Sequence, residues 1–214
     1  MKYLIFDAGP IISMSMNGLL PVLEKLKKEF NGEFIITPEV KREIVDKPMR
    51  IKKFKLEAIK VQRLIDTGVL KLSTDIVAQN TLTKENNRIL KLVNSVMRSS
   101  ETQEKIELLH IGEVSCIAFS NLCNCESLIV VDERTTRVLF EAPKKLQEVM
   151  EKKLHTTLEV NFALLEEVAH KKFIRSTELM YIAYKKGLLE LGEGKNVIDA
   201  VMYGLKSVSY THLR

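Results

Sequence analysis

Tryptophan is absent from this 214-residue chain, and aromatic residues make up only 6% of it. We therefore expect base stacking to be a minor element of any nucleic-acid contact. Cysteine is also scarce, and the three thiols are crowded into one segment as Cys116, Cys123 and Cys125. An odd number at this spacing excludes a disulfide framework. Without a second Cys or His pair at ligand spacing, buried or half-buried thiols are expected rather than a zinc site.

Long apolar runs are missing as well. No stretch approaches the roughly 18 residues that a membrane-spanning helix needs. The apolar stretch at the N-terminus is too short for a signal peptide, ends at Asp7 and has no small-residue cleavage site. We therefore expect a cytoplasmic protein that makes no membrane contact.

The positive charge of the chain is unevenly distributed. The net charge is +5 and the pI about 9.0. Between positions 41 and 63 there are nine Lys or Arg residues but only three acids. This excess favours an anionic partner such as nucleic acid, and a solvated helical surface explains it equally well.

The order of apolar patterns predicts the fold class. Short apolar runs alternate with segments of helical periodicity, which indicates an α/β fold with a parallel sheet covered by helices. The expected strands are residues 2–6, 33–37, 69–72, 127–131 and 172–175. The expected helices are 19–30, 53–67, 112–124, 133–140, 145–154, 162–170, 177–186 and 196–206, and one that begins at Pro38 behind Thr37 as N-cap. Residues 75–100 are helical in pattern but rich in Asn, which indicates an insertion or lid.

Four carboxylates occupy informative places in this pattern. Asp7 and Asp132 each follow an apolar strand, Glu43 lies on the helix after the second strand, and Glu113 lies in the first turn of its helix. Ligands of open α/β sheets bind at the carboxyl ends of the strands, so these side chains can converge. Converging carboxylates repel one another unless a cation neutralises them. A hard divalent ion such as Mg²⁺ or Mn²⁺ suits an all-oxygen site and can activate water for attack at phosphate.

Three of these acids also have an ordinary structural interpretation. Glu43, one helical turn from Glu39, fits an exposed helix acid, and Glu113 fits a residue that favours its helix dipole. Asp132 competes with its neighbour Glu133 as the cap of the following helix. Spacing alone does not decide between these roles.

Four segments in register resemble the PIN-domain ribonuclease family. They are Phe-Asp-Ala-Gly-Pro-Ile-Ile (6–12), Thr-Pro-Glu-Val-Lys-Arg-Glu (37–43), His-Ile-Gly-Glu-Val-Ser-Cys-Ile-Ala (110–118) and Val-Asp-Glu-Arg-Thr-Thr-Arg (131–137). The likeness is greatest to the branch with a Gly-Glu helix start and an Asp-Asp/Glu-Arg motif. It extends over residues 1–206 and is interrupted by expected helical insertions at about 75–105 and 143–170. Residues 207–214 are expected to form a tail outside the domain.

The resemblance implies a three-layer α/β fold and hydrolysis of RNA phosphodiesters by water that Mg²⁺ or Mn²⁺ activates. By position, Asp7 and Asp132 would be direct metal ligands, and Glu113 and Glu43 would complete the metal shell or orient the water. Many relatives are toxins held by an antitoxin, so RNA, an antitoxin-like protein and a second copy of the chain are the expected partners. The chain departs from the family at Gly9, where Ser or Thr is common. Ser13 is the candidate to supply the missing hydroxyl.

Basic residues near the motifs are candidates for holding the substrate. Arg134 and Arg137 are three apart, so both can hold the phosphate backbone or form salt bridges with neighbouring acids. Lys41 and Arg42 can steer RNA toward the pocket.

Two other functions remain open on the sequence. The run Ile5-Phe6-Asp7 suits a phosphatase with an aspartyl nucleophile, but such an enzyme usually has a second Asp at the position of Gly9. A catalytically inert PIN-like module that binds RNA or protein is the other alternative. Metal-dependent cleavage separates this module from a ribonuclease.

Overall fold

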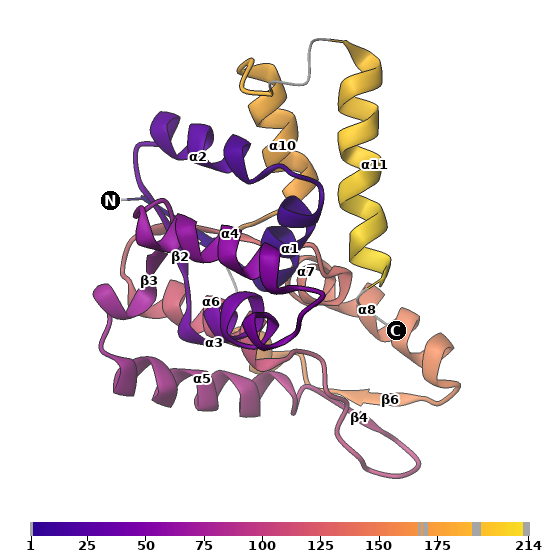
Figure 1. Ribbon diagram of the computed structural model, residues 1–214. Helices are drawn as coiled ribbons and strands as arrows, with labels where there is room; N and C mark the ends of the chain where they lie inside the picture. Colours follow the sequence, from indigo (N-terminus) through magenta and orange to yellow (C-terminus); the bar gives the residue numbers. More distant parts are fainter. Residues whose placement is uncertain (1, 167, 169–170, 190–193, 212–214) are drawn as a thin grey trace.

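A central parallel sheet organises the structure, a computed structural model that describes residues 2–166, 168, 171–189 and 194–211. Five parallel strands follow one another in the order β3-β2-β1-β5-β7, and helices flank the sheet (Figure 1). The predicted α/β class is confirmed. Within the described part of the chain, no helix is long and apolar enough to cross a membrane.

The strands overlap the apolar runs that predicted them. They are β1 (Lys2–Phe6), β2 (Glu33–Ile36), β3 (Lys71–Leu72), β5 (Glu126–Val130) and β7 (Phe173–Ile174). The middle strand β1 buries every residue after Lys2, as a strand covered on both faces must. Its register pairs Phe6 with Val130 of β5, so Asp7 and Asp132 follow neighbouring strands at the same edge of the sheet.

One helical layer covers the first face of the sheet. Its helices pack in the pairs α1·α2, α1·α4, α1·α11 and α10·α11. They are α1 (Ala8–Met16), α2 (Leu20–Glu29), α4 (Lys55–Asp66), α10 (Ser176–Lys185) and α11 (Lys195–Thr211). Helix α11 continues to Thr211, past the domain boundary expected at residue 206, and residues 212–214 lie outside the described residues.

Helix α6 (Ile111–Leu122) contacts β1 and β5, and α5 (Gln79–Val93) packs against α6 (Figure 1). Helix α5 buries Leu82, Ile89 and Val93, so the interpretation of this segment as a lid is wrong. Its periodic apolar face makes it an outer layer on α6.

The two expected insertions contact each other through a small antiparallel pair. Strand β4 (Met97–Ser99) pairs with β6 (Leu158–Val160), although helix was expected at 97–99. The remaining elements are α3 (Pro38–Lys41), η1 (Arg42–Asp46), η2 (Pro48–Arg50), η3 (Ser73–Asp75), α7 (Arg134–Glu141), α8 (Pro143–Leu154) and α9 (Ala163–Glu166). Of the helix expected at 162–170, residues 167, 169 and 170 lie outside the described residues.

Candidate functional site

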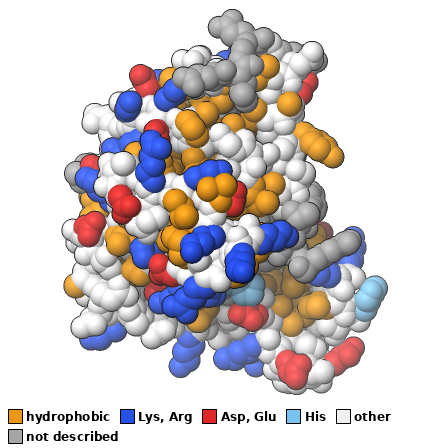
Figure 2. Space-filling view, viewed as in Figure 1, with side chains coloured by type: hydrophobic (Ala, Val, Ile, Leu, Met, Phe, Trp, Pro, Cys, Tyr) orange, Lys and Arg blue, Asp and Glu red, His pale blue; other side chains and the backbone are white. Residues whose placement is uncertain are grey.

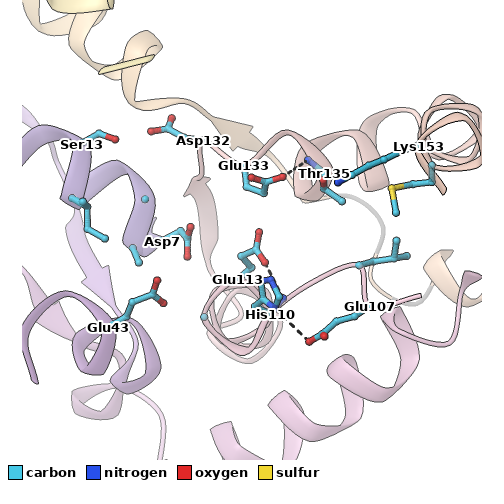
Figure 3. Close-up of a pocket in the computed structure, with 16 residues that line it drawn as sticks. Asp7, Ser13, Glu43, Glu107, His110, Glu113, Asp132, Glu133, Thr135 and Lys153 are labelled. Carbon is cyan, nitrogen blue, oxygen red and sulfur yellow. Dashed lines mark hydrogen bonds and ion pairs between the residues drawn. The ribbon is translucent and has the colours of Figure 1, made fainter. Parts of the chain in front are cut away.

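A cavity of about 380 Å³ opens at the carboxyl ends of β1 and β5, and all four predicted acids line it. Asp7 follows β1, Glu43 comes from η1, Glu113 from the start of α6, and Asp132 from the residues after β5 (Figure 3). Glu107 and Glu133 line the same cavity. The topology therefore brings together the acids that the sequence singled out.

Asp7 occupies the most electrostatically demanding position. Its amide donates to the Val130 carbonyl at 3.0 Å, which fixes it at the sheet edge, and the residue is only 8% exposed. Burial and the charge of Glu113 raise the pKa of Asp7 to about 8. The Ala8 amide partly opposes this effect, and Glu43 adds to it. Among the described residues, none of the groups that shift the pKa of Asp7 is a cation.

Gly112 permits Asp7 and Glu43 to approach the same point. A Cβ placed on Gly112 would lie 3.4 Å from Glu43 Oε2 and 3.6 Å from Asp7 Oδ1. Glu43 reaches this place from a π-helical turn, in which the Lys47 amide donates to the Arg42 carbonyl at 2.9 Å. Such turns commonly occur at functional sites. The Gly-Glu helix start thus creates the space in which two carboxylates converge.

Glu113 has a structural role in the observed geometry. Its Oε2 accepts from the His110 amide at 2.9 Å, which completes one side of a capping box at the start of α6. Its Oε1 accepts from the Thr136 hydroxyl on α7. Burial raises the pKa of Glu113, and the Thr136 and His110 hydrogen bonds oppose that rise. Glu113 therefore ties two helices together at the cavity wall.

Asp132 and Glu133 cap two different helices, α10 and α7, which the sequence alone did not decide. Glu133 caps α7 by accepting from the Thr135 amide at 3.1 Å. Asp132 Oδ1 instead accepts from the Ser176 amide at 2.8 Å, at the start of α10. Asp132 Oδ2 is buried and has no hydrogen-bond partner among the described residues. Burial raises the pKa of Asp132, and the Ser176 amide opposes that rise.

The donor set suits a hard cation, although it does not form a closed cage. Among the described residues, no group of three His, Cys, Asp or Glu side chains is arranged to hold a metal ion. Mg²⁺ commonly uses only one or two carboxylates and keeps several water molecules. The convergence of Asp7 and Glu43, and the unpartnered Oδ2 of Asp132, fit that mode of binding.

The predicted substrate-binding cations do not line the cavity. Lys41 forms an ion pair with Asp46 at 2.8 Å, and Arg42 and Arg134 are exposed. Arg137 is half-buried near Asp132, whose pKa it helps to lower.

The cavity also contains residues that the sequence analysis did not select. Lys153 of α8 lines it, as do Glu107 and His110 from the loop before α6. Lys153 and Glu107 belong to or border the expected insertions and lie in no motif, while His110 begins the 110–118 motif but was given no role there. Ser13, the candidate hydroxyl, lines the cavity as well and lies opposite Asp132 (Figure 3).

The thiols agree with the sequence analysis. Cys116 is buried and donates from Sγ to the Phe6 carbonyl at 3.6 Å, while Cys123 and Cys125 are half-buried. All three are free.

Comparisons with protein-family models, with curated proteins and with solved structures found no match to this chain.

Proposed function

We propose that the protein is a divalent-metal-dependent ribonuclease of the PIN type, which hydrolyses RNA phosphodiester bonds at the acidic cavity. The observation that carries this proposal is the convergence of Asp7, Glu43, Glu113 and Asp132 from four separate segments. Burial and neighbouring acids make the Asp7 anion costly without a cation. A purely structural carboxylate would instead be expected to have its charge compensated by the fold.

The residues of the cavity would have different roles, according to where they lie. Asp7 and Glu43 would hold Mg²⁺ or Mn²⁺ together with water, and the free Oδ2 of Asp132 offers a further oxygen. The bound ion would supply Lewis acidity toward the phosphate and lower the pKa of a coordinated water. Glu113 would act as a positioning residue, because its carboxylate fixes the start of α6 beside Gly112. Lys153 brings a positive charge to the cavity wall for the substrate phosphate.

The proposal is tested by incubating the purified protein with a pool of structured and single-stranded RNAs. Reactions contain Mg²⁺, Mn²⁺ or EDTA, and Asp7→Asn runs in parallel because it preserves shape and removes one ligand charge. We expect cleavage that requires the ion and disappears in Asp7→Asn. Cleavage that persists in Asp7→Asn would place the activity elsewhere.

A catalytically inert RNA- or protein-binding module is the second candidate. Two observations favour it: the Glu113 carboxylate is engaged by two hydrogen bonds, and Asp132 Oδ1 caps α10. Such a module would bind RNA in EDTA and leave it intact in Mn²⁺. An antitoxin-like partner and a homodimer remain predictions.

A further inference from the structure

An apolar groove lies next to the acidic cavity and shares two residues with it. The groove has a volume of about 260 Å³ and is lined by α1, by the segment from η1 to η2, and by α4. Ile12 and Glu43 line both the groove and the acidic cavity. The two hollows are therefore neighbours, and Glu43 belongs to the wall of each.

The segment beside this groove carries a dense set of positive charges. Five of the nine residues from 47 to 55 are Lys or Arg, and none is acidic. All five are exposed, and in the part of the chain that the structure describes none has a carboxylate partner: Lys47, Arg50, Lys52, Lys53 and Lys55. This differs from Lys41, Lys60 and Arg63, each of which is paired with an acid. In Figure 2, blue side chains gather around orange ones over the region of α3 and α4.

The walls of the groove are mostly apolar, and its charged lining residues are Glu43, Lys47 and Glu57. Phe54 supplies an aromatic ring to the wall of the groove. Met16 and Ile51 also line the groove and are 50% and 48% exposed. Ser15 also lines it, and the Ser15 hydroxyl is buried with no hydrogen-bond partner among the described residues. Buried hydroxyls normally have a hydrogen-bond partner, so the Ser15 hydroxyl is an exception at the wall of the groove.

We propose that single-stranded RNA lies across this face, with its phosphates on the cations of residues 47–55 and one unstacked base in the groove beside Phe54. Lys and Arg neutralise backbone phosphates, and an aromatic face accepts any base by stacking. The groove is smaller than the cavities of roughly 300–1,000 Å³ that hold drug-sized ligands, which suits one flat ring better than the long apolar face of a partner helix. The proposal rests on the proposed function, because it takes RNA as the substrate of the adjoining cavity.

Binding measured without cleavage tests the phosphate contacts. A fluorescently labelled 12-nucleotide RNA is titrated with the full chain in EDTA at several salt concentrations. The variant Lys52→Gln/Lys53→Gln is compared with Lys84→Gln/Lys91→Gln, which removes two exposed charges from α5, away from both hollows. We expect weaker binding only in the first variant. The slope of log affinity against log salt should fall by about 1.4 in magnitude, since each single-strand phosphate contact contributes about 0.7.

A single fluorophore tests the base contact. Because the chain contains no Trp, Phe54→Trp introduces a unique emission in the groove. We expect the RNA to quench this emission, while an oligonucleotide of the same length with abasic sites binds but does not. Should Phe54→Trp fold poorly, 2-aminopurine placed in the RNA reports stacking on the unmodified protein. A duplex of the same RNA should bind more weakly, because its bases are already paired.

The outcomes separate this proposal from the proposed function. Equal RNA binding by the two double variants, or equal quenching by intact and abasic strands, would overturn the groove assignment even if the protein cleaves RNA. Binding and quenching as expected, in a protein that never cleaves RNA, would support the groove and reject the hydrolysis. Absence of RNA binding together with capture of an acidic peptide by residues 47–55 would overturn the assignment in favour of a protein partner.

Discussion

Replacing Asp7 by Asn is expected to stabilise the metal-free protein. The folded structure raises the pKa of Asp7 from 3.8 to about 8. At pH 7 the unfolded chain therefore ionises this carboxyl group, while the folded chain keeps it protonated. The contribution of Asp7 to the free energy of unfolding is therefore greatest below pH 3.8 and declines as the pH rises to about 8. A neutral Asn does not titrate and avoids this decline.

The size of the effect follows from the pKa difference. Between the unfolded-state pKa of 3.8 and pH 7 lie about 3 pH units, and each unit corresponds to about 1.4 kcal/mol. The free energy of unfolding of Asp7→Asn at pH 7 should therefore exceed that of the unmodified protein by about 4 kcal/mol. For a chain of this length, a gain of that size raises Tm on the order of 10 °C. At pH 4 the gain should fall to about 0.6 kcal/mol, because the folded chain keeps the carboxyl group protonated and the unfolded chain ionises only somewhat more than half of it.

Urea unfolding followed by circular dichroism in EDTA measures this free energy at pH 4 and pH 7. Asp75→Asn is the matched control, since Asp75 is exposed and lines neither hollow. The reasoning is refuted if Asp7→Asn is no more stable than the unmodified protein at pH 7, or if its gain is the same at both pH values.

Three further predictions concern the same cavity. Mn²⁺ should raise the Tm of the unmodified protein but not the Tm of Asp7→Asn. The Mn²⁺ concentration that gives half of this increase should fall about tenfold per pH unit up to about pH 8, because Mn²⁺ binding displaces the Asp7 proton. Gly112→Ala should retain its Tm, since the added Cβ makes only ordinary contacts, yet it should weaken the Mn²⁺ response by filling the space between Asp7 and Glu43; an unchanged Mn²⁺ concentration for half of the increase would contradict this. Glu113→Ala should lower the free energy of unfolding in urea by about 1–3 kcal/mol, because the Thr136 hydroxyl and the His110 amide lose their acceptor. Glu113→Gln should lower it less.

The sequence was sufficient to predict the sheet and the convergence of the acids. The apolar runs before Asp7 and Asp132 mark strands whose last residues are buried, and parallel strands present their carboxyl ends at one edge. The π-helical turn that carries Glu43 was not predictable in this way. Its shifted hydrogen bonding, of which the bond from the Lys47 amide to the Arg42 carbonyl is an example, leaves no mark in the apolar periodicity.

The segments expected to be insertions show where sequence reasoning failed. Asn residues made 75–100 look like a polar lid, yet Asn86 is buried and donates to Glu39 at 3.1 Å. Asn94 accepts from the Leu108 and Leu109 amides and so holds the loop that lines the cavity. These are tertiary contacts of polar side chains. Residue type and spacing alone do not distinguish them from solvated positions, and the same limit applies to the pairing of β4 with β6.

The most direct test of metal-dependent RNA hydrolysis at this cavity is single-turnover cleavage of an end-labelled, single-stranded RNA. The reaction compares the unmodified protein, Asp7→Asn and Asp75→Asn in Mn²⁺ and in EDTA, and the chemistry of the product ends is determined. We predict cleavage by the unmodified protein and by Asp75→Asn only with Mn²⁺, no cleavage by Asp7→Asn, and products without 2′,3′-cyclic phosphate, because water is the nucleophile. Cleavage that survives EDTA or Asp7→Asn, or that leaves cyclic phosphate ends, would contradict the account.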